Sequence, residues 1–147
     1  MIRIICVGKL TQKQLKPLIE HYQKQIPMQI DWLEVLDEAS EKQMHLEAER
    51  IIKVIDKNDF VIALAIEGKM FDSQSFSKMI ESHFIYNQKR LVFLIGGSYG
   101  LNEEVLKRVD MKISFSKMTF PHQLMRLILI EQIYRAFMIQ RNHPYHK

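Results

Sequence analysis

The chain has 147 residues, of which 47% are apolar, and a formal net charge of +4. This length supports one sizeable hydrophobic core, so we expect a single domain over residues 1–147. The lone cysteine, Cys6, cannot form an internal disulfide, the first residues lack a signal-peptide pattern, and no apolar run is long enough to span a membrane. These features argue against a secreted disulfide-stabilised protein and a membrane protein, and we expect a cytoplasmic one.

Short apolar runs rich in β-branched residues alternate along the chain with longer stretches of helical periodicity. The runs predict strands over 1–7, 29–35, 60–66, 91–95 and 111–115, and the stretches predict helices over 12–25, 41–56, 73–86, 102–109 and 123–140. Parallel strands need crossover connections, and crossover helices cover both faces of a sheet. The alternation therefore predicts an α/β fold with a largely parallel sheet and helices on both faces.

Every glycine follows the carboxyl end of a predicted strand: Gly8, Gly68, Gly96, Gly97 and Gly100. In open α/β sheets this edge binds ligands, and loops without side chains let a small molecule approach the backbone. The stretch FLIGGSYGLNEE has neither Rossmann nor P-loop spacing, and Glu103 and Glu104 at the start of the next helix would repel a phosphate. The glycines favour a pocket for a ligand other than a phosphate, with an ordinary strand-to-helix turn as the alternative.

The stretch SFSKMTFPHQLMR follows the fifth predicted strand and leads into the last helix. Its apolar side chains can line a slot for a flat ring and its hydroxyls can hydrogen-bond a polar ligand; these residues are Phe115, Met118 and Phe120, with Ser116 and Thr119. The alternative is a structured loop with buried aromatic rings. His122 has no metal-ligand partner at suitable spacing, and we interpret it as structural.

The last predicted helix, LMRLILIEQIYRAFMI, is apolar on more than one face. It is either a central core helix or a helix that packs on the sheet with one face and on a second subunit with the other. Physical grounds favour the dimer. Glu131 and Arg135 have the four-residue spacing that allows an ion pair along the helix.

Basic residues gather toward the C-terminus, where eight lysines and arginines accompany two acidic residues from Lys107 onward. Such a region suits an anion, and nucleic acid is the largest candidate, although charge alone favours a solvated basic face. The ending RNHPYHK adds an aromatic ring and two imidazoles. Tyr145 can stack on an unpaired RNA base while Arg141 and Lys147 contact phosphates, with a frayed chain end as the alternative.

Three stretches, FLIGGSYGL, MTFPHQLMRLILIEQIYRA and the terminal NHPYHK, resemble in order and spacing the bacterial SPOUT-class methyltransferases that modify N3 of a pseudouridine in 23S ribosomal RNA. The similarity extends over the whole chain. It implies a SPOUT-type α/β knot, with five to six strands in a largely parallel sheet and a C-terminal trefoil knot, an exception to the rule of unknotted chains. It also implies a homodimer that uses S-adenosylmethionine, without a metal ion, to methylate 23S rRNA in the ribosome.

The resemblance further implies roles for single residues. The cofactor contacts would be Leu64, Gly96, Phe115, Ser116, Lys117, Met118, Thr119 and Phe120. The tail would carry the substrate site, which the other subunit completes. Because attack by N3 requires removal of its proton, our hypothesis is that His143 or His146 acts as the base and that Arg135 stabilises negative charge on a base carbonyl. Lys147 stands where many relatives have arginine, and Ser98-Tyr99 stands where Pro-Glu is more usual, so Tyr99 receives no role.

Two other functions fit parts of the same pattern. A ribosome-associated RNA-binding protein without catalysis would keep the fold and the basic tail, and a SPOUT methyltransferase acting on tRNA would keep the pocket. Only the NHPYHK ending argues against the tRNA enzyme.

Overall fold

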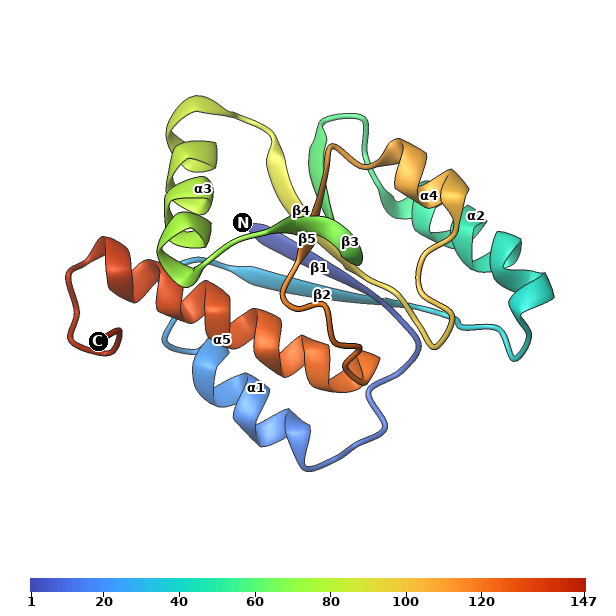
Figure 1. Ribbon diagram of the computed structural model, residues 1–147, viewed down its shortest axis with the longest axis horizontal. Helices are drawn as coiled ribbons and strands as arrows, with labels where there is room; N and C mark the ends of the chain where they lie inside the picture. The colour runs from blue at the N-terminus through green and yellow to red at the C-terminus, as the bar shows by residue number, and fades with distance from the viewer.

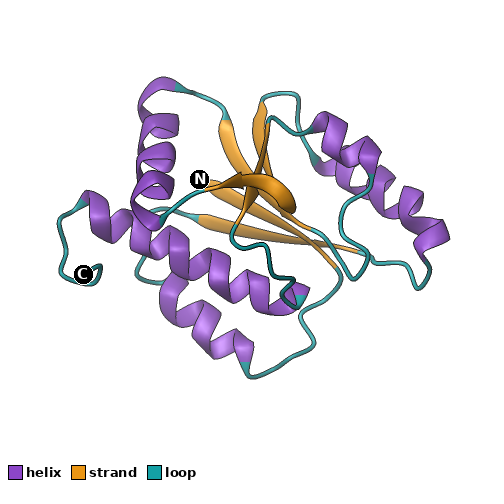
Figure 2. Cartoon of the chain, in the orientation of Figure 1, coloured by secondary structure: helices purple, strands orange, loops and turns teal.

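The structure, a computed structural model, describes residues 1–147 and contains one sheet of five parallel strands (Figures 1 and 2). The strands lie in the order β2-β1-β4-β3-β5. Their bounds are β1 (Ile2–Val7), β2 (Ile30–Val35), β3 (Asp59–Met70), β4 (Arg90–Ile95) and β5 (Met111–Ser114). The predicted α/β fold with a parallel sheet is thereby confirmed.

Helices cover both faces of the sheet, as the alternating pattern predicted. They are α1 (Leu15–Gln23), α2 (Met44–Val54), which follows a 3₁₀ turn at Glu41–Gln43, α3 (Ser73–Tyr86), α4 (Glu103–Arg108) and α5 (His122–Gln140). Helices α1, α3 and α5 lie on one face, and α2 and α4 on the other (Figure 1). Each face of the sheet therefore has its own hydrophobic core. Because successive side chains of a strand point to opposite faces, Ile4 packs in the core with α1, α3 and α5, and Ile5 packs in the core with α2 and α4.

Strand β3 is longer than the predicted 60–66 because it bends and pairs with β5 twice. Its first half aligns Leu64 with Ile113, and after a register shift Lys69 aligns with the same Ile113. A Cβ atom on Gly68, inside this bend, would lie 2.6 Å from the backbone nitrogen of Ile113, so only glycine fits there. The curled end of β3 crosses β5 in Figure 2. This wrapping of one strand around another is compatible with a knotted C-terminal part.

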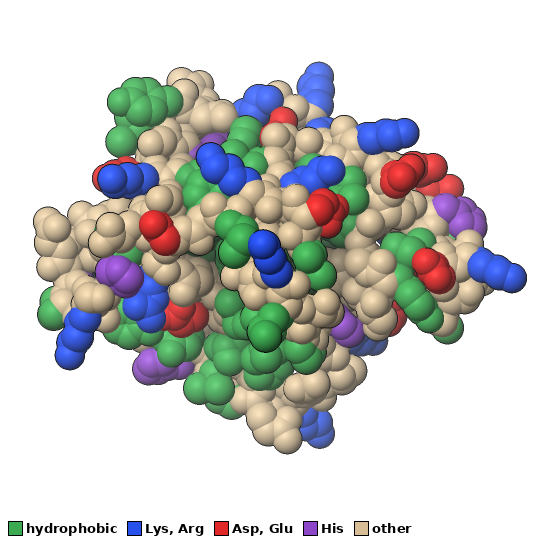
Figure 3. All heavy atoms as spheres, viewed as in Figure 1, with side chains coloured by type: hydrophobic (Ala, Val, Ile, Leu, Met, Phe, Trp, Pro, Cys, Tyr) green, Lys and Arg blue, Asp and Glu red, His purple; other side chains and the backbone are tan.

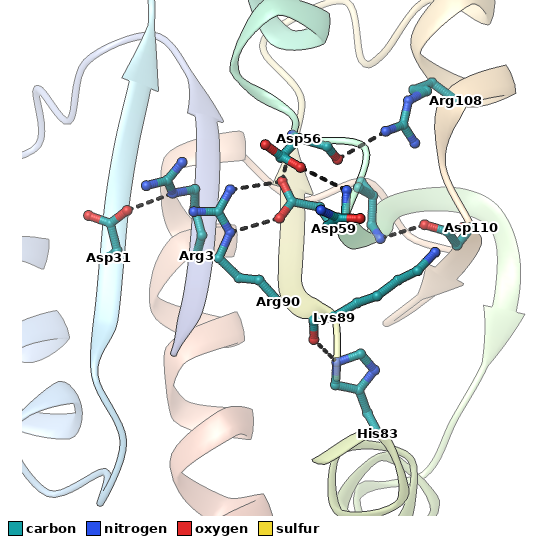
Figure 4. A network of polar contacts seen from close by, with 11 residues as sticks. Arg3, Asp31, Asp56, Asp59, His83, Lys89, Arg90, Arg108 and Asp110 are labelled. Carbon is teal, nitrogen blue, oxygen red and sulfur yellow. Dashed lines mark hydrogen bonds and ion pairs between the residues drawn. The ribbon is translucent and has the colours of Figure 1, made fainter. Parts of the chain in front are cut away.

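The amino-terminal edge of the sheet is closed by a polar network (Figure 4). Arg90 donates to both carboxylate oxygens of the buried Asp59, at 2.8 and 2.9 Å, and Asp110 accepts the Val61 N–H at 2.8 Å. Burial alone would raise the pKa of Asp59, but hydrogen bonds from Arg90 and the Asp56 N–H hold it below the ordinary value. Because these groups satisfy one another, this edge is structural, and the opposite edge carries the loops that follow β3, β4 and β5.

Candidate functional site

A cavity of about 800 Å³ opens at the carboxyl edge of the sheet, among the loops that follow β3, β4 and β5. Residues 64–67, 95–101 and 113–116 contribute to its wall, together with the segment that leads into α5. The glycine turn and the loop before the last helix therefore share one pocket, as their positions in the sequence predicted. The volume lies within the range of small-molecule sites.

Seven of the eight residues predicted to contact a cofactor line this cavity: Leu64, Gly96, Phe115, Ser116, Met118, Thr119 and Phe120. Lys117 is the exception and does not belong to the wall. Gly97 and Gly100, which the sequence also placed beside a ligand, line the cavity as well, whereas Ala65, Glu67, Ile95, Leu101 and Met125 were not predicted. Ala65, Glu67 and Ile95 lie at or next to the end of a predicted strand, and Met125, inside α5, carries no such signal. His122, interpreted from the sequence as structural, also lies in the wall.

The glycine turn is tight for reasons internal to the protein. A Cβ atom on Gly96 would lie 2.7 Å from the carbonyl carbon of Gly100, and one on Gly97 would lie 3.0 Å from a methyl of Val7. Gly100 has a φ of +75°, and its N–H donates to the Gly97 carbonyl at 3.0 Å. Glycine at 96 thus allows the turn to close on itself, and this closed turn forms one wall of the cavity.

The loop between β5 and α5 is shaped by its own hydroxyls. Ser114 donates to the Ser116 carbonyl at 2.8 Å, and the Ser116 hydroxyl accepts the Met118 N–H at 3.0 Å. The Phe115 ring meets Phe76 edge-on, with ring centres 5.8 Å apart, and is therefore held by the core. Met118 is 73% exposed and lies at the rim. The cavity wall is consequently fixed on its inner side and open on its outer side.

The start of α5 is tied to strand β2 and to the loop after β1 by a buried arginine. Arg126 is 3% exposed and donates to Glu34 Oε2 at 2.6 Å and to the Gly8 carbonyl at 2.7 Å. Gln123, one turn earlier, accepts the N–H groups of Thr11 and Gln12 at 2.9 Å each. These contacts fix the end of α5 that borders the cavity.

A second cluster of polar side chains lies at the other end of α5, where the tail folds back. Glu131 Oε1 accepts Arg135 Nη2 at 2.6 Å, Arg135 Nε at 3.0 Å and the Tyr145 hydroxyl at 2.8 Å. Arg135 lies over the Tyr145 ring, 4.7 Å from its centre, and Nη1 lies 3.1 Å from His146 Nδ1. The ion pair expected from the spacing of Glu131 and Arg135 is present, and it holds the tail as well. We call Glu131, Arg135, Tyr145 and His146 the tail cluster.

Neighbouring groups set the protonation states within the tail cluster. The hydrogen bond from Arg135 to Glu131 raises the pKa of the guanidinium above its ordinary value. Burial, followed by the hydrogen bond to Glu131, raises the pKa of the Tyr145 phenol as well. Arg135 therefore stays positive and Tyr145 stays neutral throughout the physiological range.

The cavity and the tail cluster of one chain do not meet. No residue of the tail cluster lines the cavity; along α5 the last wall residue, Met125, is about 9 Å from Glu131 and about 15 Å from Arg135 at 1.5 Å per residue. Figure 1 shows the C-terminus at the end of α5 away from the β5–α5 loop. The residues predicted for cofactor and for substrate thus form two separate sites within a chain.

A half-buried stripe connects the two sites on the outer side of α5. Its members recur at helical spacing: Leu124, Leu127, Ile128, Glu131, Gln132 and Arg135. The half nearer the cavity is apolar and the half nearer the tail is polar. Figure 3 shows hydrophobic side chains gathered over the part of this face where α1 and α5 run, with charged and histidine side chains toward the tail.

Two further properties concern other kinds of site. No group of three or more histidine, cysteine, aspartate or glutamate side chains is placed to hold a metal ion. None of the helices combines the length and the apolar character needed to cross a bilayer.

Comparison with known proteins matches nearly the whole chain. Residues 1–146 fit a family model described as "Predicted SPOUT methyltransferase". Two proteins from different strains of Streptococcus pyogenes, each named "Ribosomal RNA large subunit methyltransferase H", are each 47% identical to this chain over 157 aligned positions, which cover 99% of both sequences. A solved structure, of a probable methylase family protein from Haemophilus influenzae, is 15% identical, covers 99% of this chain and 70% of its own, and superposes with a TM-score of 0.59. That last likeness concerns the fold alone.

Proposed function

The chain belongs to the SPOUT methyltransferase family, and from this premise we propose that it transfers a methyl group from S-adenosylmethionine to N3 of a pseudouridine in 23S rRNA of the large ribosomal subunit. The relatives' shared name supports ribosomal RNA of that subunit as the substrate. The terminal NHPYHK supports the pseudouridine, because it is the stretch on which the resemblance to the N3 enzymes rests. Ribosomal RNA as substrate would place the protein in the cytoplasm.

The composition of the cavity wall supports S-adenosylmethionine as the ligand. The wall contains no lysine or arginine, and its one acidic side chain, Glu67, is exposed at the rim. S-adenosylmethionine supplies a methyl group carried on a positively charged sulfur, beside an adenine ring. An apolar wall suits the ring, a carboxylate suits the positive charge, and a phosphate-bearing cofactor would lack the cations that it needs. We assign this role to the seven predicted wall residues and exclude Lys117 from it.

The tail supplies the groups that suit an RNA substrate. Arg141 and Lys147 are exposed, and we assign them to backbone phosphates. The Tyr145 ring contacts the Arg135 guanidinium and the Tyr134 ring, each 4.7 Å from its centre, and we assign the part of the ring that stays exposed to a base. Arg135, His143 and His146 lie on or beside the tail cluster, and we assign them to the pseudouridine itself.

A homodimer would join the two sites, and the separation of about 15 Å along α5 between the wall residue Met125 and Arg135 is the observation that carries this part of the proposal. A two-fold axis perpendicular to α5 would pack the two copies of this helix antiparallel. The apolar half of the stripe on one helix would then face the polar half of the stripe on the other. Leu124, Leu127 and Ile128 would then be buried. In the same arrangement the tail of one subunit lies beside the cavity of the other, so that each active site takes residues from both chains.

The direct test uses ribosomes that lack the modification. The protein is incubated with them and with labelled S-adenosylmethionine, and the methylated nucleotide is identified by mass spectrometry. We expect label on N3 of one pseudouridine in 23S rRNA and none when that position is left as uridine. Label in tRNA, or on another atom, would contradict the proposal.

Cofactor binding is measured separately by thermal unfolding. A ligand present at 100 times its dissociation constant adds about 2.7 kcal/mol to the free energy of unfolding. The absence of a shift with S-adenosylmethionine would support the non-catalytic RNA-binding protein instead.

A further inference from the structure

The two histidines of the tail each have one ring nitrogen already engaged. His146 Nδ1 lies 3.1 Å from Arg135 Nη1. A guanidinium has only N–H donors and does not lose its proton in proteins, so His146 Nδ1 accepts in this contact. A neutral imidazole that accepts at Nδ1 carries its proton on Nε2.

His143 is held in the same way by a different donor. Its Nδ1 accepts the backbone N–H of Tyr145 at 3.2 Å. A backbone N–H is a permanent donor, so the lone pair of this ring also lies on Nδ1 and the proton on Nε2. Both contacts come from groups that cannot reverse their direction, and two independent partners therefore impose the same tautomer on both rings.

We propose that His143 and His146 present Nε2–H groups to the substrate and act as hydrogen-bond donors to the imide carbonyls of pseudouridine, not as the base that removes the N3 proton. This inference rests on the proposed function, and it replaces the hypothesis that one of these histidines is the base. To accept a proton at Nε2, either ring would have to carry hydrogen on Nδ1. That hydrogen would face the N–H of Arg135 in one case and of Tyr145 in the other.

No other group of the tail cluster supplies a base in their place. Arg135 contacts His146, and the Tyr145 backbone contacts His143. The other titratable groups lie one contact further away, against Arg135 or Tyr145: Glu131 and Tyr134 from α5 and Tyr22 from α1. Arg135 stays positive, and the Tyr145 phenol donates its proton to Glu131. Glu131 Oε1 accepts three hydrogen bonds, and Gln132 donates to Glu131 Oε2 at 2.8 Å. The cluster is therefore rich in donors and its one carboxylate is fully engaged.

A donor-rich site binds the imide anion better than the neutral imide. The site therefore favours loss of the N3 proton before the methyl group is transferred. The N3 proton passes to solvent water or hydroxide, which leaves negative charge on N3 and the two carbonyl oxygens. Arg135 and the two Nε2–H groups stabilise that charge. N3 then forms a bond to the methyl carbon, the carbon–sulfur bond breaks, and its electron pair stays on sulfur, which becomes neutral. The rest of the rate acceleration comes from holding N3 in line with the carbon–sulfur bond.

The tautomers are measurable without any methylation. Long-range ¹H–¹⁵N correlation spectra of the full-length protein, recorded near pH 7.5, distinguish Nδ1–H, Nε2–H and doubly protonated imidazole. His143→Gln and His146→Gln assign the two signals. We expect the Nε2–H pattern for both rings, whereas the Nδ1–H pattern or an imidazolium would overturn the proposal. Because this readout needs no substrate, it remains informative if methylation of pseudouridine is not observed.

Two substitutions at His146 separate a donor from a base in single-turnover methylation. Glutamine places an N–H near the position of Nε2, whereas asparagine keeps an acceptor for Arg135 but loses the outward donor. We expect His146→Gln to remain within about tenfold of the unmodified protein and His146→Asn to lose about 10²-fold, the scale of one lost donor at an anionic site. Equal, large losses in both would support a base. His45→Gln, on an exposed histidine of α2, is the matched control.

The pH profile gives an independent answer. A base with an ordinary histidine pKa of about 6.5 makes the rate level off above about pH 7.5, because the base is then fully deprotonated. Reaction through the imide anion makes the logarithm of the single-turnover rate rise with unit slope through that range. A plateau that disappears in His146→Gln or His143→Gln would refute the donor role.

Discussion

The buried ion pair between Arg126 and Glu34 yields an asymmetric prediction about stability. Arg126 is 3% exposed, whereas Glu34 is 40% exposed. If the arginine is replaced by methionine, Glu34 is left on the surface, where water can solvate its charge. If Glu34 is replaced by glutamine, a positive charge with one unpaired buried N–H, on Nε, stays in the interior and keeps only the Gly8 carbonyl as a strong partner. Removal of the exposed partner should therefore cost more than removal of the buried one.

The magnitudes follow from the two desolvation terms. Leaving a buried charge without its partner costs about 3–5 kcal/mol, and losing ordinary hydrogen bonds from a solvated partner costs about 1–2 kcal/mol. For a chain of this size, a loss of 1 kcal/mol lowers Tm by about 2–4 °C. We expect Glu34→Gln to lower Tm by roughly 6–20 °C and Arg126→Met by roughly 2–8 °C.

The assay is urea and thermal unfolding of both variants at one protein concentration, because subunit association would make Tm depend on concentration. Asp31→Asn is a suitable control, since its partner Arg3 is 23% exposed and can be solvated. An Arg126→Met variant that is less stable than Glu34→Gln would refute the reasoning.

Three further predictions concern separate parts of the fold. The pKa of Asp59 is depressed, so its pair with Arg90 stabilises the protein above the unfolded-state pKa, and this contribution disappears as pH falls through the folded-state pKa. Asp59→Asn should therefore lower the free energy of unfolding at pH 7 and make it depend less on pH between pH 5 and 3. An unchanged acid dependence would contradict this. Gly68→Ala should prevent soluble folding or cost more than about 3 kcal/mol, because its Cβ would lie 2.6 Å from the Ile113 backbone; a variant with unaltered Tm would exclude the tight crossing. Burial raises the pKa of the Cys6 thiol to about 12, so the folded protein should not react with a thiol reagent at pH 8 until urea unfolds it, and rapid labelling of the folded chain would refute this.

The succession of strands and helices along the chain was predictable, because a parallel sheet leaves a strong pattern in a sequence, whereas the order of the strands in the sheet was not predicted. The buried strands β1 and β4 are apolar except for Arg3 and Arg90, and helices fill the intervals. The second half of β3 was not predictable. Residues Glu67 to Met70 are mostly polar or exposed, and only the pairing with β5 makes them a strand.

The candidate site was predictable to the extent that it depends on local sequence. Position after a strand placed Gly96 and Phe115 at one cavity, because every parallel strand delivers its following loop to the same edge. The contact of Arg126 with Glu34 joins residues 92 positions apart, and no local pattern records it. The contact of Tyr145 with Glu131 depends on a tail that turns back over α5, after Asn142 adopts a positive φ of 54°.

The composite active site is tested most directly by mixing two inactive variants. Ala65→Arg places a cation in the cavity wall, and a chain that ends at Asn142 lacks the groups of the tail. Each variant alone should be inactive, because every site in its dimer has one defect. Dimers with one chain of each kind, prepared by co-expression with two affinity tags, should regain about half of the activity per dimer, because one of their two sites combines the intact cavity with the intact tail. Mixed dimers that stay inactive while both chains bind each other would contradict a site shared between subunits.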